Sequence, residues 1–165
     1  MVFAGLVLYL LLLDFIVIHI DLTWLQVWEA SAVSWLQNSA GIENTLNLAD
    51  ISIAYASPAF SMQIIALCTG ISELLFFAFL AMLVRGPKMG SRLKGLAIFL
   101  PAIFIINIIR LLMLHPLAAW LGVQAMWEVH WFIWKYGMFI VLMALFAAWF
   151  MAFARKGMQI QGTQE

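Results

Sequence analysis

Four long apolar stretches, separated by more polar connections, set the pattern of this chain. They cover residues 1–20, 62–84, 95–114 and 131–153. A helix needs roughly 20 residues to cross a hydrocarbon core about 30 Å thick, and each stretch reaches this length. The pattern therefore predicts four transmembrane helices.

The connection over residues 21–61 is too patterned for a plain linker. Within 22–37, apolar residues that include Trp28 and Trp35 recur at helical spacing. This spacing predicts a helix that lies in the membrane interface with its tryptophans at headgroup level. Residues 41–58 are polar and mixed, and we assign no element to them.

Composition supports the membrane interpretation. Of the 165 residues, 66% are apolar and 10% are charged, whereas soluble domains carry about 25% charged residues. The chain has one cysteine, which excludes a disulfide scaffold. Eight basic residues balance eight acidic ones, so no surplus exists for binding nucleic acid by bulk charge. We expect an all-α fold class, a polytopic membrane helical bundle in one domain over 1–165.

Basic residues in the connections predict the orientation. They concentrate in 85–94 and directly after the fourth stretch, whereas 21–61 and 115–130 contain none. Because positive connections stay inside, we expect a multi-pass protein of the cytoplasmic (inner) membrane with both termini, including the tail 154–165, in the cytoplasm. The first stretch has no basic residues before its apolar run and is therefore interpreted as a retained helix rather than a signal peptide.

This orientation places three reactive side chains in one outer layer. Cys68 lies about 9 Å and Arg110 about 6 Å below the outer ends of their stretches, at 1.5 Å per residue. His130 stands at the outer mouth of the fourth. A cation favours the thiolate or the oxyanion, and an imidazole can accept the thiol proton, so these are the parts of a cysteine acyl-transfer site. Each of the three also has an ordinary structural interpretation. Taken singly, Cys68 is a packing residue, Arg110 an arginine that snorkels to the interface, and His130 an interfacial histidine.

Three neighbours are candidates for support or substrate binding. Gly70 allows close backbone approach, and Ser72 shares the helical face of Cys68 at i+4. Asn107, three residues before Arg110, is placed to hold the guanidinium or a substrate backbone, or to bridge two helices.

The remaining ionisable groups leave alternatives open. Glu73 points away from the thiol and is expected to pair with Lys135 or Arg110. His115 competes with His130 as the base, and Glu128 either orients His130 or is solvated. Two further groups on the first stretch are candidates for a polar patch: Asp14 and His19.

The order of these residues resembles the exosortase/archaeosortase family of membrane transpeptidases. C-T-G-I-S begins at Cys68, N-I-I-R runs from Asn107 to Arg110, and a single histidine, His130, opens the next stretch. The resemblance covers residues 62 to about 135 and leans slightly to the bacterial exosortases, because His130 stands where archaeal members can have Arg. Four helices make this a short variant.

The resemblance implies a substrate and a reaction. The substrate is a surface protein with a C-terminal signal made of a short motif, a transmembrane helix and a basic tail. Cys68 attacks near the motif and forms a thioester, Arg110 and His130 assist, and the product passes to water or to a surface acceptor such as a lipid. No cofactor, metal or nucleic acid is implied.

Two other functions fit the same composition. Three histidines in a four-helix bundle are compatible with a non-catalytic subunit that binds haem or quinone. Alternatively, Asp14, Glu73 and Arg110 line the polar path of a transporter or an assembly scaffold.

Overall fold

The computed structural model describes residues 15, 19–85 and 87–154. The predicted first helix, with Asp14, and the C-terminal tail lie almost wholly outside these residues. The expectations about them therefore stay predictions.

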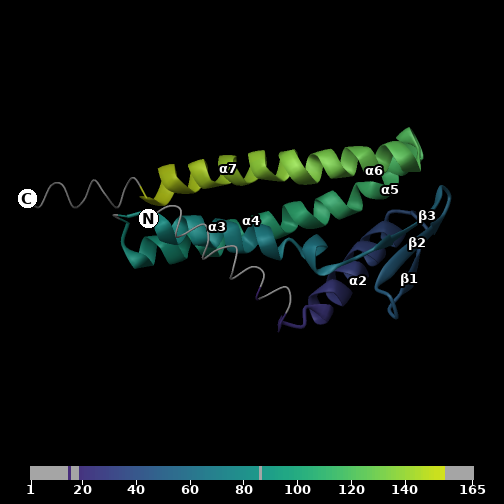
Figure 1. Ribbon diagram of the computed structural model, residues 1–165, viewed down its shortest axis with the longest axis horizontal. Helices are drawn as coiled ribbons and strands as arrows, with labels where there is room; N and C mark the ends of the chain where they lie inside the picture. The colour runs from purple at the N-terminus through teal and green to yellow at the C-terminus, as the bar shows by residue number, and fades with distance from the viewer. Residues whose placement is uncertain (1–14, 16–18, 86, 155–165) are drawn as a thin grey trace, which may run out of the picture.

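Two long helical stretches dominate the described part of the chain (Figure 1). One covers 33 residues and the other 31, and both are long and apolar enough to cross a membrane. The chain reverses between them at Gly122, whose φ of 85° is one that glycine adopts without strain. The first stretch consists of α4 (Met89–Leu112) and α5 (Leu114–Leu121), and the second of α6 (Val123–Phe132), the π-helical turn η2 (Ile133–Gly137), α7 (Met138–Trp149) and a second π-helical turn, η3 (Phe150–Ala154).

The third apolar helix, α3, is shorter than predicted. It covers Ile71–Leu83, which is 13 residues or about 20 Å at 1.5 Å per residue. The interpretation of 62–84 as one spanning helix is therefore wrong. Its first part is a strand end, a 3₁₀ turn named η1 (Ala66–Thr69) and Gly70 in the left-handed conformation. Of the residues described, only α4–α5 and α6–α7 reach spanning length, so four transmembrane helices are not confirmed.

The described residues are mainly helical, as predicted, but they also form a small antiparallel sheet, so the fold is not all-α. The order of the sheet is β1-β2-β3, and Tyr55 of β2 lies opposite Phe60 of β3. Larger apolar residues alternate in β2 and β3 with small or polar ones, a pattern that suits a half-buried sheet. The stretch 41–58, to which no element was assigned from the sequence, thus holds β1 (Thr45–Asn47) and β2 (Ser52–Ala56), and β3 (Ala59–Gln63) comes directly after it.

Helix α2 (Thr23–Ser39) covers the stretch where an interfacial helix was expected. It turns its polar side inward, where it packs against α4, η1 and the sheet. Gln37 is buried there, accepts a hydrogen bond from the Tyr55 hydroxyl at 2.6 Å and donates one to the Leu112 carbonyl at 3.3 Å. The opposite side exposes Trp24, Trp28 and Trp35. The tryptophan face is therefore largely exposed, although the Trp28 ring also lies against Phe104 of α4.

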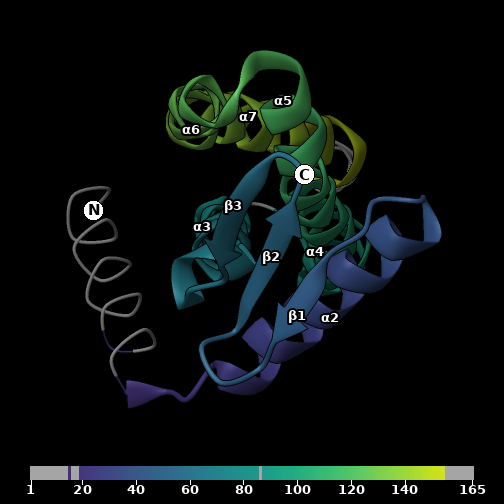
Figure 2. The same ribbon diagram turned by 90° about the vertical axis from the view of Figure 1, so that its right-hand side faces the viewer.

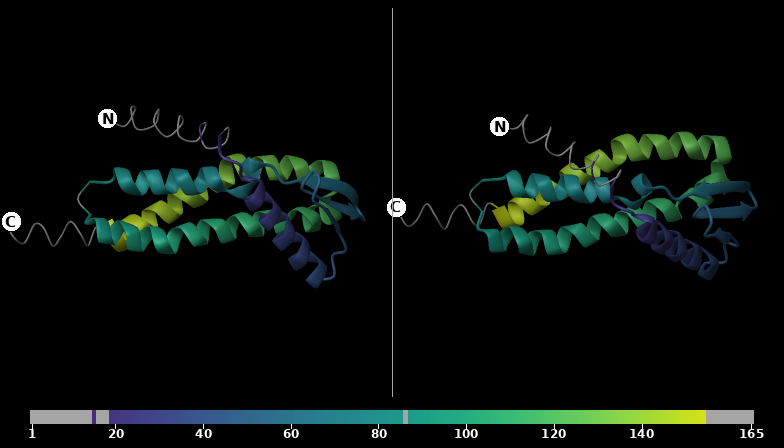
Figure 3. Two further views of the ribbon diagram at one scale, coloured as in Figure 1. Left: turned by 90° about the horizontal axis from the view of Figure 1, so that it is seen from below. Right: turned by 60° about the horizontal axis from the view of Figure 1, so that its bottom comes forward.

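These elements divide the molecule into a helical bundle and a sheet end, by which we mean the end where α2 and β1–β3 lie (Figure 2). In the bundle, α3 runs beside α4 (Figure 3) and packs against α7 as well. Phe77, Ile103 and Leu142 form the core between them. Gly95 lets α4 and α7 approach closely, because a side chain there would collide with the Trp149 indole.

Candidate active site

Cys68 lies at the junction of the sheet end and the bundle. It sits in η1, where its N–H donates to the Ile65 carbonyl at 2.8 Å, and Gly70 separates this turn from α3. Cys68 and Ser72 therefore do not share one helical face, as the sequence suggested. The thiol is instead just ahead of the N-terminus of α3, where the helix dipole favours an anion.

Two side chains of α4 hold the backbone of Cys68. The Cys68 carbonyl oxygen accepts a hydrogen bond from Asn107 Nδ2 at 2.8 Å and another from Arg110 Nη2 at 3.1 Å. Asn107 and Arg110 are three residues apart, so both project from one face of the helix. The structure thus places the Asn107 amide against the backbone of the candidate nucleophile, a contact that the sequence did not predict.

Gly70 makes this contact possible. Its φ is 70°, in the left-handed region, and a Cβ built there would lie 3.0 Å from Cγ of Asn107. Other residues rarely adopt this φ without strain. The expectation of a close approach at Gly70 therefore has a specific partner, Asn107.

Arg110 is buried, with 8% of its surface exposed, instead of extending to the interface. Its Nη2 binds the Cys68 carbonyl, but its Nε and Nη1 are buried without a hydrogen-bond partner. Buried donors without partners are costly, and a guanidinium cannot lose its charge to avoid the cost. Two donors of Arg110 are therefore available to a ligand.

Cys68, Arg110 and His130 line one cavity of about 260 Å³, which we call the Cys68 cavity. They come from η1, α4 and α6. His130 lies inside α6, which begins at Val123, so it does not open the helix as expected from the sequence. The other residues of the wall are mostly apolar and aromatic: Gln63, Ile65, Leu67, Trp127, Trp131 and Trp134.

Burial raises the pKa of the Cys68 thiol. A hydrogen bond with the backbone of Ile65 and the charge of Arg110 oppose this rise, whereas the nearby carboxylates Glu29 and Glu73 add to it. The neutral thiol therefore dominates near neutral pH. A base in the cavity is needed to form the thiolate.

The other histidines lie elsewhere. His115 Nε2 is 3.1 Å from the Ser57 carbonyl oxygen, and its ring lies against Tyr55 with the ring centroids 4.9 Å apart. His115 is therefore part of the contact between α5 and the sheet and does not line the Cys68 cavity. His19 is exposed and stacks on Phe15.

Glu128 does not orient His130. It is exposed and accepts a hydrogen bond from Gln124 Nε2 at 3.2 Å. The ring that His130 meets is the indole of Trp127, edge to face, with the centroids 5.9 Å apart.

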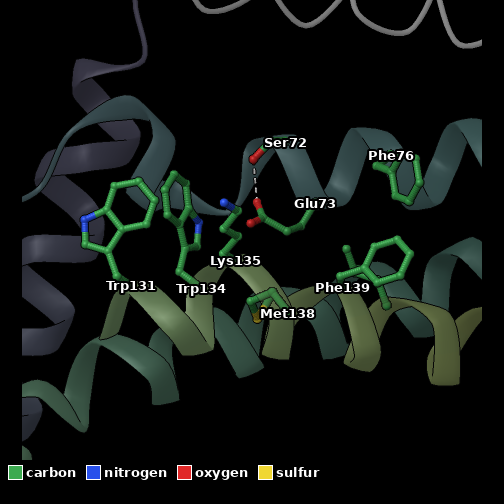
Figure 4. Close-up of a pocket in the computed structure, with 9 residues that line it drawn as sticks. Ser72, Glu73, Phe76, Trp131, Trp134, Lys135, Met138 and Phe139 are labelled. Atoms are coloured by element: carbon green, nitrogen blue, oxygen red, sulfur yellow. Dashed lines mark hydrogen bonds between the residues drawn. The ribbon is translucent and has the colours of Figure 1, made fainter. Parts of the chain in front are cut away.

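Ser72 and Glu73 belong to a second cavity, of about 330 Å³, between α3 and α6–α7. The Ser72 hydroxyl donates to Glu73 Oε2 at 2.6 Å, and Lys135 points toward Glu73 from the opposite wall (Figure 4). Trp131 and Trp134 line this cavity and the Cys68 cavity. The two spaces thus adjoin, but Ser72 is not brought to the thiol.

Glu29 is a buried acid of the site that the sequence reasoning missed. It has no exposed surface, and its Oε1 accepts a hydrogen bond from Asn107 Nδ2 at 3.3 Å. Burial raises its pKa to about 7, although the Asn107 hydrogen bond and the charge of Arg110 lower it and Glu73 raises it further. Glu29 is the one carboxylate on α2, and the tryptophan spacing that predicted an interfacial helix gave no sign that this carboxylate is buried.

These features define a helical membrane protein with a thiol, a guanidinium and an imidazole around one cavity. The model of the transmembrane exosortase family (Exosortase_EpsH) matches residues 1–150. The chain therefore belongs to the transmembrane exosortase family. No match to a curated protein and none to a solved structure was found. In general, the family implies a cysteine transpeptidase that acts on C-terminal sorting signals at the membrane.

Proposed function

We propose that this chain is a membrane-embedded cysteine transpeptidase or protease. It cleaves the C-terminal sorting signal of surface proteins, made of a short motif, a transmembrane helix and a basic tail, through a thioester on Cys68. The observation that carries the proposal is that Cys68, Arg110 and His130 line one cavity although they lie on three separate elements. Membership of the exosortase family supports the same reaction class.

His130 is the general base and acid of this reaction. Burial keeps the Cys68 thiol protonated, so attack requires a proton acceptor in the cavity. His130 is the imidazole that lines it, and a neutral imidazole has a ring nitrogen that accepts a proton. His130 accepts the thiol proton as the sulfur approaches the substrate carbonyl, and the imidazolium later returns that proton to the leaving amine.

Arg110 and Asn107 serve the attack in different ways. Asn107 holds the Cys68 carbonyl and so fixes the turn that carries the sulfur. Arg110 makes a similar contact with Nη2 and keeps Nε and Nη1 without partners. These two donors stabilise the oxyanion that forms when the Cys68 sulfur bonds to the carbonyl carbon.

The tetrahedral intermediate then breaks its carbon–nitrogen bond. The signal peptide leaves as an amine, and the surface protein stays attached to Cys68 as a thioester. Water or a surface acceptor such as a lipid attacks this thioester, and the thiol is released as the new bond forms. Deprotonation of the acceptor by His130 and reprotonation of the sulfur restore the starting state.

The predicted orientation suits this substrate. A signal helix whose basic tail stays in the cytoplasm presents its motif at the outer leaflet. The site lies at the sheet end, which the predicted orientation places on the outer side, with both termini inside. Cleavage is thus expected at the outer leaflet of the cytoplasmic membrane.

Co-expression with a candidate substrate tests the proposal. The candidate is a protein encoded near this gene that ends in a short motif, an apolar helix and a basic tail. We expect the parent to shorten the candidate and Cys68→Ala to leave it intact. Ser61→Ala, an equally small change at an exposed strand position, is the control. Processing by Cys68→Ala at the parent's rate would refute the proposal.

A further inference from the structure

We propose that Glu29 is a positioning residue for the Cys68 nucleophile. It fixes the Asn107 amide that holds the Cys68 carbonyl, and its charge opposes formation of the thiolate. This inference rests on the proposed function, because it takes Cys68 as the nucleophile. It adds a fourth element, α2, to a site built from η1, α4 and α6.

A chain of contacts joins Glu29 to the thiol residue. Asn107 Nδ2 donates to Glu29 Oε1 at 3.3 Å and to the Cys68 carbonyl at 2.8 Å. Gly70 packs against the same amide, so Asn107 has little room to turn. The amide is therefore held between α2 and η1, and the loss of its carboxylate partner frees one side of it.

The burial of Glu29 argues against a merely solvated helix face. Both Glu29 and Asn107 have no exposed surface, and Glu29 Oε2 has no hydrogen-bond partner. A buried carboxylate with an unsatisfied oxygen costs stability. Stability alone thus does not account for a carboxylate at this position.

Charge couples Glu29 to the thiol. Arg110 is the buried cation among the described residues. It faces three groups that can each become an anion, namely Glu29, Glu73 and Cys68. Because one cation is shared, each added negative charge makes the next one harder to form.

The elements packed against α2 supply the charges that Glu29 meets. These elements are α4, η1, β1 and β2. Arg110 comes from α4 and Cys68 from η1, while Glu73 acts from α3. β1 has no titratable side chain, and the Tyr55 hydroxyl of β2 is bonded to Gln37.

The sign of the effect follows from these charges. With a pKa of about 7, Glu29 is ionised at the higher pH where the Cys68 thiol loses its proton, and it then opposes the thiolate. Replacing Glu29 with a neutral glutamine removes this opposition. The Cys68 thiolate then forms at lower pH.

Alkylation of Cys68 tests this without any substrate. The chain has one cysteine, so intact-mass detection of iodoacetamide labelling reports on Cys68. The alkylation midpoint is the pH at which the labelling rate of Cys68 is half-maximal. We expect Glu29→Gln to lower this midpoint by roughly half a pH unit or more. Glu43→Gln, the same change at an exposed position, should leave it in place. A midpoint equal to that of the parent in Glu29→Gln would refute the charge effect.

Processing of the candidate substrate tests the positioning role. Glu29→Gln keeps an oxygen that accepts from Asn107, and Glu29→Ala does not. We therefore expect kcat to fall about tenfold in Glu29→Ala with KM unchanged, and to stay within about threefold in Glu29→Gln. If Glu29→Ala does not fold, Glu29→Asp replaces it, because the shorter side chain also loses the contact. An unchanged kcat in the folded variant would refute the role.

The two experiments separate this inference from the proposed function. If Cys68→Ala still processes the substrate, the proposed function fails, whatever Glu29 does. If Cys68→Ala is inactive and both Glu29 variants match the parent in alkylation and kcat, only the role of Glu29 fails.

Discussion

The side-chain amide of Asn107 lies 2.8 Å from the backbone carbonyl oxygen of Cys68. The contact joins the C-terminal part of α4, a long apolar helix, to the short turn that carries the thiol. Arg110, one helical turn further, binds the same oxygen. The turn is thus held by side chains of a helix, and such support keeps the position and orientation of a nucleophile fixed.

Loss of this contact should reduce the reaction more than the folding. In Asn107→Ala, Arg110 still holds the Cys68 carbonyl, but the turn gains freedom. We expect processing of the candidate substrate to fall about tenfold or more, because misplacing a reacting group by an ångström costs up to a hundredfold. Initial rates at saturating substrate measure it. Asn47→Ala, at an exposed position of β1, is the control. Equal rates in Asn107→Ala and the parent would contradict the positioning role of Asn107.

Gly70→Ala should destabilise the fold. The alanine would have to adopt a φ of 70°, and its Cβ would lie 3.0 Å from the Asn107 side chain. The left-handed conformation alone costs about 1–2 kcal/mol. The melting temperature of Gly70→Ala in detergent should therefore lie clearly below that of the parent.

Two other glycines separate the causes of that loss. Gly41 has a φ of 83° with no atom near a built Cβ, so Gly41→Ala reports the backbone strain alone. Gly90 lies in α4, and a Cβ built there meets open space. Gly90→Ala should therefore raise the free energy of unfolding by up to about 1 kcal/mol. A Gly70→Ala loss no greater than that of Gly41→Ala would mean that contact with Asn107 costs nothing.

Neutralising Arg110 should shift the pKa of the Cys68 thiol in the direction opposite to the shift caused by Glu29→Gln. The charge of Arg110 lowers the pKa of Cys68, so Arg110→Gln should shift the alkylation midpoint of Cys68 to higher pH. Lys94→Gln removes a positive charge at an exposed position of α4 and serves as the control. A shift of Arg110→Gln to lower pH, or no shift, would contradict the shared-cation account.

The geometry of Arg110 should matter as well as its charge. Arg110→Lys keeps the cation but loses the planar fork that reaches the Cys68 carbonyl and a substrate oxygen together. We expect a large fall in kcat with the alkylation midpoint near that of the parent. If Arg110→Lys processes at the rate of the parent, charge alone is sufficient.

The two bundle histidines should differ sharply. His130 lines the Cys68 cavity, whereas His115 lies against Tyr55 and the Ser57 carbonyl. His130→Gln should abolish most processing, since general acid–base catalysis contributes about 10²–10⁴-fold. His115→Gln should retain it, with at most a loss of stability. The opposite order of effects would make His115 the base.

The sequence allowed the site to be predicted better than the local structure around it. Cys68, Arg110 and His130 were predicted to share one layer, because rare polar groups in apolar stretches stand out. The contacts of Asn107 and Arg110 with the Cys68 carbonyl were not predictable. The depth of a residue in the membrane does not determine how its helix is rotated about its axis. Ser72 was misplaced because Gly70 interrupts the helix that the apolar composition suggested.

The sheet and Glu29 show why the rest was missed. β3 passes directly into an apolar segment, so the residues from Met62 to Ile64 were interpreted as the start of a spanning helix. Their alternation of buried and exposed positions is visible only once β2 pairs with them. Glu29 lies on α2, where the tryptophans suggest that the apolar side is buried and the side with Glu29 is exposed, whereas the structure has the reverse. The burial of Glu29 depends on tertiary packing against Asn107, which no local pattern reports.

The most direct test of the central claim is mass spectrometry of the protein isolated while it turns over the candidate substrate. We predict an acyl adduct on the peptide that contains Cys68, with the mass of the substrate peptide that ends at the newly formed C-terminus, less one water. Neutral hydroxylamine should remove it, as expected of a thioester. A substrate that is cleaved with no adduct on Cys68 in the parent, and is still cleaved at the same rate by Cys68→Ala, would contradict the account.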